Sequence, residues 1–320
     1  MPLPGPTEIR AAHAVIAPHI RRTPLIEAAS PVAGASAISL KLDLLQHSGS
    51  FKARGAFHNL LTRAAPAVGC ATASGGNHGA AVAFAAQALG VRAKIFVPEI
   101  ANPTKIEKIR RSGADVHVEG ARYADAQALC DAYVAATGAL SIHPFDADAT
   151  IAGAGTVGLE WEGDLAALGQ TPLDTVLIAV GGGGLVAGVA AWFENRVKVV
   201  AVEPTGSRAL FEARRAGAPV DVEVESVAAD SLGAKRVGAR NFAIAARFVA
   251  DCVLVEDQAI VAAQRRLWRD FCLVTEPGGA AAYAALADGA YRPEGGERVG
   301  VLLCGGNVDL AAFAGVARSA

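Results

Sequence analysis

The chain has 320 residues, of which 52% are hydrophobic and 19% are charged, and its formal net charge is −2. This composition predicts a large buried core and excludes a mainly disordered protein, and the length favours two domains. The lysines and arginines are scattered along the chain, so we expect neither a nucleic-acid partner nor a polybasic membrane-binding surface.

Short apolar runs alternate with helical patterns through most of the chain. Toward the N-terminus we expect strands at residues 68–72, 93–97 and 114–118, and helices at about 79–89, 103–113 and 123–137. Toward the C-terminus we expect strands at 175–180, 197–202 and 298–303, a helix at about 185–193, and a crossover at 144–155. This alternation predicts an α/β fold with mainly parallel sheets flanked by helices on both faces.

We predict two interleaved domains. The larger combines residues 1–64 with 146–320, and the smaller, mobile one comprises residues 65–145. In open parallel sheets, ligands bind beyond the carboxyl ends of the strands. Three segments follow such strand ends, namely residues 74–78, 181–184 and 304–307. We therefore expect one composite site between the domains.

The uncharged stretch from Val176 to Phe193 is long enough to cross a bilayer. Four glycines in its middle would break a membrane-spanning helix, so a strand, a turn and a buried helix explain it better. We expect no membrane span.

The five cysteines lie far apart and form no Cys-x-x-Cys pair and no metal-ligand pattern with histidine. They are Cys70, Cys130, Cys252, Cys272 and Cys304. This usage predicts reduced thiols in a cytoplasmic protein.

Gly181 to Gly184 join a predicted strand to a predicted helix, an arrangement that binds phosphate through backbone N–H groups. Gly182-x-Gly184-x-x-Ala187, with Glu203 at the end of the next strand, also fits a dinucleotide fingerprint loosely. An NAD-binding oxidoreductase is therefore one interpretation of this turn. A tight turn with no ligand is another.

Lys52 lies in the segment Ser48-Gly49-Ser50-Phe51-Lys52-Ala53-Arg54-Gly55-Ala56, between a small polar turn and an apolar helical start. Burial at this position would favour the neutral amine, which reacts with an aldehyde cofactor. By position alone, the commoner interpretation is a surface lysine whose amine extends into solvent.

The segment around Lys52 resembles the lysine motif of fold-type II pyridoxal 5'-phosphate (PLP) enzymes, in particular the serine/threonine dehydratase and serine racemase family. Ser74-Gly75-Gly76-Asn77-His78-Gly79 resembles the family's substrate-carboxylate loop, Gly181 to Gly184 its phosphate loop, and Cys304-Gly305-Gly306-Asn307 its pyridine-side segment. The likeness extends from about Thr23 to Asp309. It implies a tryptophan synthase beta-like fold, PLP as cofactor, a small-molecule amino-acid substrate and a homodimer.

The resemblance also implies roles for single residues around the cofactor. Lys52 would hold the cofactor covalently and later act as the base for the substrate's α-proton, and Phe51 would pack against the cofactor ring. Asn77 would bind the phenolic oxygen, and Glu276 would line the site unless it is a structural carboxylate. Gly181, Gly182, Gly183 and Gly184 would bind the phosphate, and the substrate carboxylate would bind to Ser74, Gly75, Gly76, Asn77 and His78.

At the position of Cys304 the family places a neutral hydroxyl or thiol beside the pyridine nitrogen. A thiol there does not stabilise a protonated nitrogen, and the weaker electron sink that results favours elimination over transamination. The alternative is an ordinary buried cysteine at a strand end.

Three departures from the family pattern discriminate between activities. Racemases of this group carry a serine where this chain has Gly75, which cannot donate a proton, so we do not expect racemisation as the main activity. His78 stands where cysteine synthases usually have threonine, which argues against β-replacement. Glu203 matches the first carboxylate of the family's cation site, but Ala209 stands at the second, so we predict no metal.

The sequence therefore predicts a PLP-dependent dehydratase, or ammonia-lyase, that converts L-serine, L-threonine or a similar 3-hydroxy amino acid to a 2-oxo acid and ammonia. Dehydration of hydroxyaspartate or phenylserine, and serine racemisation, are the alternatives nearest in chemistry. An NAD-binding oxidoreductase and a non-catalytic PLP or amino-acid carrier are the alternatives from other classes. Residues 228–238 match the family less closely, so the pocket for the substrate side chain is not predicted.

Overall fold

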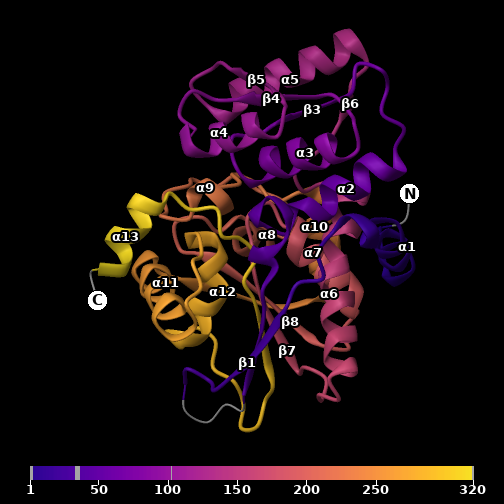
Figure 1. The fold of residues 1–320 in the computed structure, drawn as a ribbon. Coiled ribbons are helices and arrows are strands. Elements are labelled where there is room, and N and C mark those ends of the chain that lie inside the picture. The colour runs from indigo at the N-terminus through magenta and orange to yellow at the C-terminus, as the bar shows by residue number, and fades with distance from the viewer. Residues whose placement is uncertain (1–2, 33–36, 102, 319–320) are drawn as a thin grey trace.

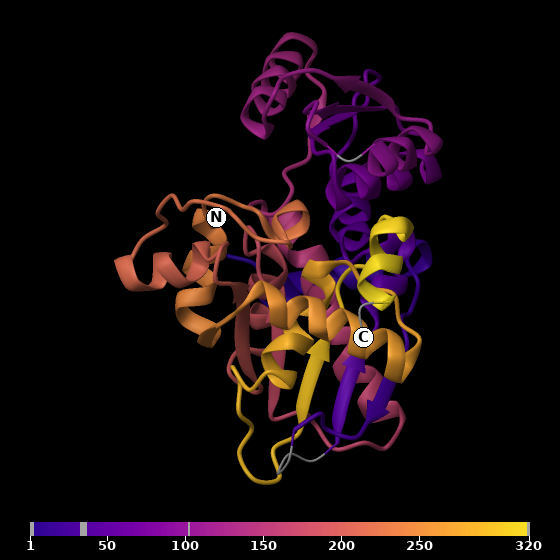
Figure 2. The same cartoon turned by 90° about the vertical axis from the view of Figure 1, so that its left-hand side faces the viewer.

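The computed structural model describes residues 3–32, 37–101 and 103–318, and within them the chain forms two mainly parallel sheets flanked by helices (Figures 1 and 2). The predicted α/β class is confirmed. We call the four-stranded sheet with its helices, residues 70–141, the small unit. The six-stranded sheet and the helices packed on it form the large unit.

The sheet of the large unit has the strand order β1-β2-β10-β7-β8-β9, and only β1 runs antiparallel to its neighbour. Strands β2, β7 and β10 are buried at every position, and β7 and β10 are correspondingly almost free of polar residues. The strands are β1 (Leu25–Ala28), β2 (Ile38–Lys41), β7 (Thr175–Ala179), β8 (Lys198–Pro204), β9 (Val249–Val255) and β10 (Val299–Leu302).

Helices cover both faces of this sheet (Figure 1). One side is covered by α1 (Pro6–Ile16), α6 (Asp148–Ala167), α7 (Gly184–Phe193) and α10 (Ala239–Phe248). The other side is covered by α11 (Asp257–Phe271) and α12 (Pro277–Ala287), with α13 (Leu310–Arg318) packed on α11. The shorter α8 (Ala209–Ala216) and α9 (Ala229–Leu232) follow β8. No helix within the described ranges is both long and apolar enough to span a membrane.

The small unit contains a parallel sheet in the order β5-β4-β3-β6 (Figure 1). Its strands are β3 (Cys70–Ala73), β4 (Ala93–Val97), β5 (Asp115–Val118) and β6 (Leu140–Ser141). Helix α3 (Asn77–Ala88) contacts this sheet and α4 (Pro103–Arg111), and α5 (Tyr123–Thr137) packs on β3 and β4.

The predicted helices and strands match the observed ones to within two residues at each end. The later part of the predicted crossover, residues 148–155, forms the first turns of the long helix α6. The glycines of α6 are needed for close packing: a Cβ at Gly153 would lie 2.7 Å from the Cα of Gly55, and one at Gly155 would lie 2.7 Å from the oxygen of Gly188. Helix α3 begins at Asn77 and not at Gly79, so Asn77 and His78 occupy its first turn.

Helix α2 (Lys52–Thr62) lies at the junction of the two units, since it packs on α6 of the large unit and on α3 of the small unit. Below its first turn lies a buried network of charges. Arg54 donates to Asp43 Oδ1 at 2.6 Å and to Glu160 Oε2 at 3.0 Å, and Lys41 donates to Glu160 Oε1 and to Asp164 Oδ2, both at 2.7 Å.

The charges of this network compensate one another. Burial alone would raise the pKa of Glu160, but Arg54 and Lys41 outweigh it and lower that pKa to about 2. The network ties the start of α2 to β2 and α6, and it thereby fixes the helix turn that carries Lys52.

We predict that Arg54→Met destabilises the fold by about 3–5 kcal/mol, because the buried Asp43 loses its cation and Glu160 keeps only Lys41. Urea unfolding followed by circular dichroism would measure the change. Arg236→Met is the control, since Arg236 forms an exposed pair with Asp221, and the free energy of unfolding should stay unchanged. Equal effects of the two substitutions would contradict the importance of the network.

Candidate active site

A cavity lies beyond the carboxyl ends of β7 and β10, close to the start of α2 and α3. All of the residues predicted from the sequence to bind the cofactor line it. They are Phe51, Lys52, Asn77, Gly181, Gly182, Gly183, Gly184, Glu276 and Cys304. The structure therefore brings together five segments that are far apart in the sequence.

Backbone hydrogen bonds hold the lysine segment against the segment that follows β10. Ser50 and Gly305 form an isolated antiparallel bridge. The Phe51 N–H donates to the Cys304 oxygen, and the Gly306 N–H donates to the Gly49 oxygen, both at 3.0 Å. This pairing places the side chain of Lys52 beside that of Cys304.

The Lys52 amine lies inside the protein and not in solvent. It donates to the Pro144 oxygen at 2.6 Å and lies 5.0 Å from the centre of the Phe51 ring. Burial lowers the pKa of Lys52 from 10.5 to about 8, so a substantial fraction of the amine is neutral near physiological pH. The surface-lysine interpretation does not fit this environment.

The glycine turn after β7 leads directly into helix α7, which begins at Gly184. The first N–H groups of a helix have no acceptor within that helix, so they are available to an anion. Close packing also requires glycine in this turn. Gly183 has φ +90°, and a Cβ at Gly182 would lie 2.4 Å from the ring of Phe145. The glycines thus allow the close packing of Phe145 on this turn.

The predicted substrate-carboxylate loop joins β3 to α3 and lies beside the cavity. Asn77 lines the cavity, whereas Ser74, Gly75, Gly76 and His78 are not among its lining residues. The Gly76 N–H donates to Ser74 Oγ at 3.2 Å, so this hydroxyl shapes the turn. His78 is buried, its Nε2 contacts the Ile142 oxygen at 3.0 Å, and burial lowers its pKa to about 3. Its imidazole is therefore neutral.

The position of Gly75 leaves no room for a side chain. A Cβ there would lie 2.5 Å from the Cβ of Ala101 and 2.9 Å from Cγ1 of Val97. A serine could not be placed in this loop without moving these neighbours.

Asn77 is held in place by two residues of the large unit. Its Nδ2 donates to the carboxylate of Glu276, and its Oδ1 accepts from Asn307 Nδ2 at 2.8 Å. Glu276 is buried and also accepts from Lys105. The structure therefore places Glu276 next to both the cavity and the small unit.

Cys304 is buried, and its thiol contacts the Gly278 oxygen at 3.7 Å. Burial, reinforced by the charge of Glu276, raises the pKa of this thiol to about 12. The side chain is therefore neutral at physiological pH.

Glu203 has a structural role that the sequence did not reveal. Its carboxylate accepts from the N–H groups of Leu210 at 2.9 Å and Phe211 at 2.8 Å, and from the Cys252 thiol at 3.4 Å. It therefore caps helix α8 and is not free to bind the ribose of a dinucleotide. The oxidoreductase interpretation loses the acidic residue on which it relied.

Sequence reasoning missed several residues of the cavity wall. Phe145, Ser231, Leu232 and Gly278 line it, and Lys105 contacts Glu276 from the small unit. Phe145 and Ser231 follow no recognisable motif, and only the tertiary packing brings them to the glycine turn. For Lys105, the one available signal was its position about one helical turn before Lys108 on a strongly amphipathic helix.

Comparison with known proteins agrees with this geometry. A family model described as "Pyridoxal-phosphate dependent enzyme" matches residues 16–305. The chain belongs to this family.

Individual relatives cover nearly the whole chain. It is 37% identical to the phenylserine dehydratase of Ralstonia pickettii over 98% of this chain and 96% of that protein. Among solved structures, it is similar to the threonine deaminase of T.th., with a TM-score of 0.88, 36% identity, and 96% and 99% of the two chains covered. It is also similar to maize serine racemase, with a TM-score of 0.89, 30% identity, and 97% and 96% covered. These similarities support a dehydratase-type member of the family.

The residues of the cavity fit PLP. A partly neutral amine, a helix N-terminus that offers N–H donors, an aromatic ring at Phe51 and a neutral thiol match the aldehyde, the phosphate, the ring and the pyridine nitrogen in turn. Among the described lining residues, only Glu276 carries a carboxylate that could repel the phosphate. This carboxylate is bound to Asn77 and Lys105.

We predict that Gly75→Ser destabilises the protein by about 1–3 kcal/mol, because its side chain overlaps Ala101 and Val97. The displaced loop should also raise KM for the substrate. Thermal unfolding and steady-state kinetics would measure the two effects. Gly163→Ser on α6 is the control, since a Cβ there meets nothing within 4 Å; an equally stable Gly75→Ser variant would contradict the packing argument.

We also predict a pH dependence for the attachment of PLP to the cofactor-free protein. The neutral amine is the reactive form, so the rate should rise with pH and level off above about 8, the lowered pKa of Lys52. Stopped-flow absorption after mixing with PLP would follow the reaction. A rate that keeps rising toward pH 10.5, the ordinary value, would show that Lys52 is not desolvated.

Proposed function

We propose that this protein is a PLP-dependent dehydratase that converts L-threonine or L-serine to a 2-oxo acid and ammonia. The observation that carries the proposal is the position of Lys52, whose desolvated amine lies in one cavity with the glycine turn and the neutral Cys304 thiol. The names of the relatives, which include a threonine deaminase and a phenylserine dehydratase, support the same reaction type.

In this proposal, the side chains divide the work as follows. Lys52 would hold the cofactor through its amine and, in its neutral form, would accept the proton from the substrate's Cα. The loop at residues 74–78 binds the substrate carboxylate at the N-terminus of α3, where negative charge is stabilised. Asn77 orients the cofactor ring, and the N–H groups at the start of α7 hold its phosphate. PLP, when bound, supplies an electron-accepting ring that stabilises negative charge at Cα.

The neutral thiol of Cys304 provides no negative charge for a pyridine nitrogen. A ring without that charge would hold the electron pair from Cα weakly, which favours loss of the hydroxyl from Cβ. A Cα–Cβ double bond would form, and the hydroxyl would leave as water with a proton equivalent to the one that Lys52 removed from Cα. The unsaturated amine that results is hydrolysed, and this step consumes one water and releases ammonia. The net change is one hydroxy amino acid converted to one 2-oxo acid and one ammonia, with no oxidant or reductant.

Phenylserine is the second candidate substrate. Phe145 and Leu232 give the cavity wall an apolar surface suited to contact with a phenyl group, and one relative is named for this activity. Racemisation is less well supported, because Gly75 has no side chain to act as a second acid and no room for one.

We propose further that residues 65–145 form a mobile domain that closes over the cavity and excludes water from the reacting groups.

We also propose a cytoplasmic homodimer. All five cysteines are free thiols, as expected for a reducing compartment.

The proposed function predicts a yellow protein that loses its visible absorption on treatment with borohydride, with the added mass on the peptide containing Lys52. Incubation with L-threonine, L-serine, 3-phenylserine and 3-hydroxyaspartate should release 2-oxo acid and ammonia in equal amounts from at least one of the first three. Lys52→Ala should abolish both the colour and the turnover, because no other amine replaces it.

Lys198→Ala is the matched control, since Lys198 is exposed and begins β8 at the end of the sheet opposite the cavity. It should retain full activity. Inversion of recovered serine faster than 2-oxo acid release would favour a racemase, and colour retained in Lys52→Ala would refute the assignment of the lysine.

A further inference from the structure

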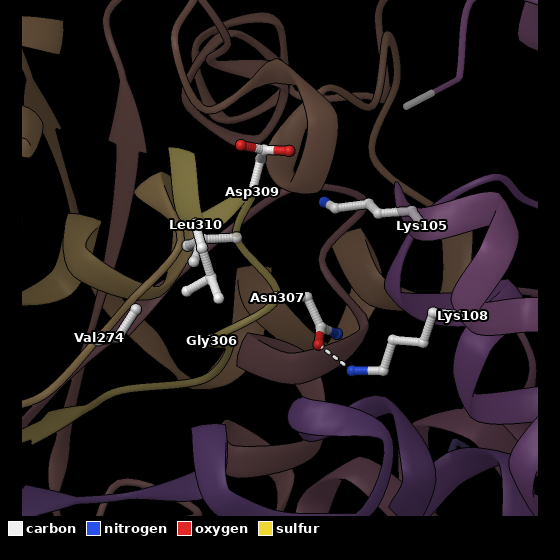
Figure 3. A pocket seen from close by; sticks show the side chains of 8 residues that line it. Lys105, Lys108, Val274, Gly306, Asn307, Asp309 and Leu310 are labelled. Carbon is white, nitrogen blue, oxygen red and sulfur yellow. Dashed lines mark hydrogen bonds between the residues drawn. The ribbon is translucent and has the colours of Figure 1, made fainter. Parts of the chain in front are cut away.

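Lys105 reaches from the small unit into the large unit (Figure 3). It lies on α4, and its amine contacts two carboxylates of the large unit. It donates to Asp230 on α9 and to Glu276 Oε2 at 3.5 Å. Only 9% of the Lys105 side chain is exposed. A lysine so deeply buried requires partners, and here both partners belong to the other unit.

Glu276 connects Lys105 to the cofactor cavity. Its Oε2 accepts from Lys105, and its Oε1 accepts from Asn77 Nδ2. Burial raises the pKa of Glu276, and the charge of Lys105 and the hydrogen bond from Asn77 act in the opposite direction. Lys105 thus stabilises the charged form of a buried carboxylate that would otherwise favour its proton.

The positive charge of Lys105 is also stabilised by its partners. Burial would lower the pKa of its amine, but Glu276 and Asp230 outweigh burial and raise it. The ammonium and the two carboxylates therefore form a cluster of charges across the boundary between the units, with one more negative than positive group.

A second lysine of the same helix reaches the other partner of Asn77. Lys108 donates to Asn307 Oδ1, and Asn307 Nδ2 donates to Asn77 Oδ1 at 2.8 Å (Figure 3). Each of the two polar groups that hold the Asn77 amide is thus bound by one lysine of α4. The geometry of this amide is linked on both sides to the position of α4.

We propose that Lys105 is a positioning residue that orients Asn77 through Glu276 and does so only when the small unit lies against the large unit. The inference rests on the proposed function, because it takes Asn77 as a contact of the cofactor. Closure would then complete the cofactor site, and an open small unit would leave Asn77 without an oriented acceptor.

Removal of the amine has a definite consequence for Glu276. The carboxylate becomes a buried, uncompensated charge, so it takes up a proton or turns toward solvent. In either case Asn77 loses an ionised acceptor, and its amide is no longer held toward the cavity. Replacing Glu276 with glutamine removes the charge that Lys105 compensates, so Lys105 should no longer matter in that background.

A double-mutant cycle tests this link with Lys105→Met, Glu276→Gln and the combined variant. The readouts are the PLP dissociation constant, from titration of cofactor-free protein, and the absorption spectrum of the bound cofactor. We expect Lys105→Met to weaken PLP binding about tenfold and to shift the absorption band. In the Glu276→Gln background the same substitution should change binding less than about twofold. Lys105→Arg, which keeps the charge, should restore most of the affinity.

Arg111→Met is the matched control, because Arg111 lies on the same helix and forms an exposed pair with Glu107. It should bind PLP like the unmodified protein. An effect of Lys105→Met that is equally large with glutamine at position 276 would overturn the inference, as would an unchanged spectrum in Lys105→Met. If Lys105→Met alone does not fold, the PLP affinities of Glu276→Gln and the combined variant are compared instead. A weaker affinity in the combined variant would contradict coupling through the carboxylate.

The titration uses PLP alone and needs no substrate. A protein that binds PLP and shows the expected coupling, yet releases no 2-oxo acid, would refute the proposed reaction and support the role of Lys105. A protein that turns over substrate but shows no coupling would support the proposed reaction and refute the role of Lys105.

Discussion

The pairing between residues 49–51 and residues 304–306 is the interaction on which the active site depends. Three backbone contacts, at Gly49, Ser50 and Phe51, hold the start of α2 against the chain that leaves β10. They bring Lys52 and Cys304 to the wall of one cavity. The same environment lowers the pKa of the amine and raises that of the thiol, so both groups are available in their neutral forms. Burial alone thus favours both the neutral amine of Lys52 and the neutral thiol of Cys304.

The sequence predicted those parts of the site that depend on local patterns. The glycine turn, the lysine segment and the segment after β10 each follow a recognisable strand or precede a helix, and the carboxyl ends of parallel strands meet at one edge. For this reason their convergence could be anticipated without coordinates. The alternation of apolar strands and helices predicted the α/β class for the same reason. The start of α3 was misplaced by two residues because its first turn, Asn77 and His78, has little helical preference of its own.

The remaining features depend on contacts between segments that are far apart in the sequence. The glycines of α6 allow close packing on Gly55 and Gly188, and the sequence alone does not reveal these contacts. Glu203 looked like a ribose or metal ligand, but it satisfies the first turn of α8. Lys105 carried almost no signal, since its two partners lie 125 and 171 residues further along the chain. Tertiary partners decide the roles of such residues, and no local rule reveals them.

The contact between Gly55 and Gly153 bears on how the two units can move. Their backbones approach so closely that a single added methyl group would collide, and this leaves α2 and α6 no freedom to slide past each other. In the proposed opening of the small unit, Lys52 on α2 would therefore stay with α6 and the large unit. The contact that could change is the one between α3 and the other face of α2. If the small unit moves as proposed, the Lys52 amine would keep its place in the large unit while the wall formed by the small unit changes position.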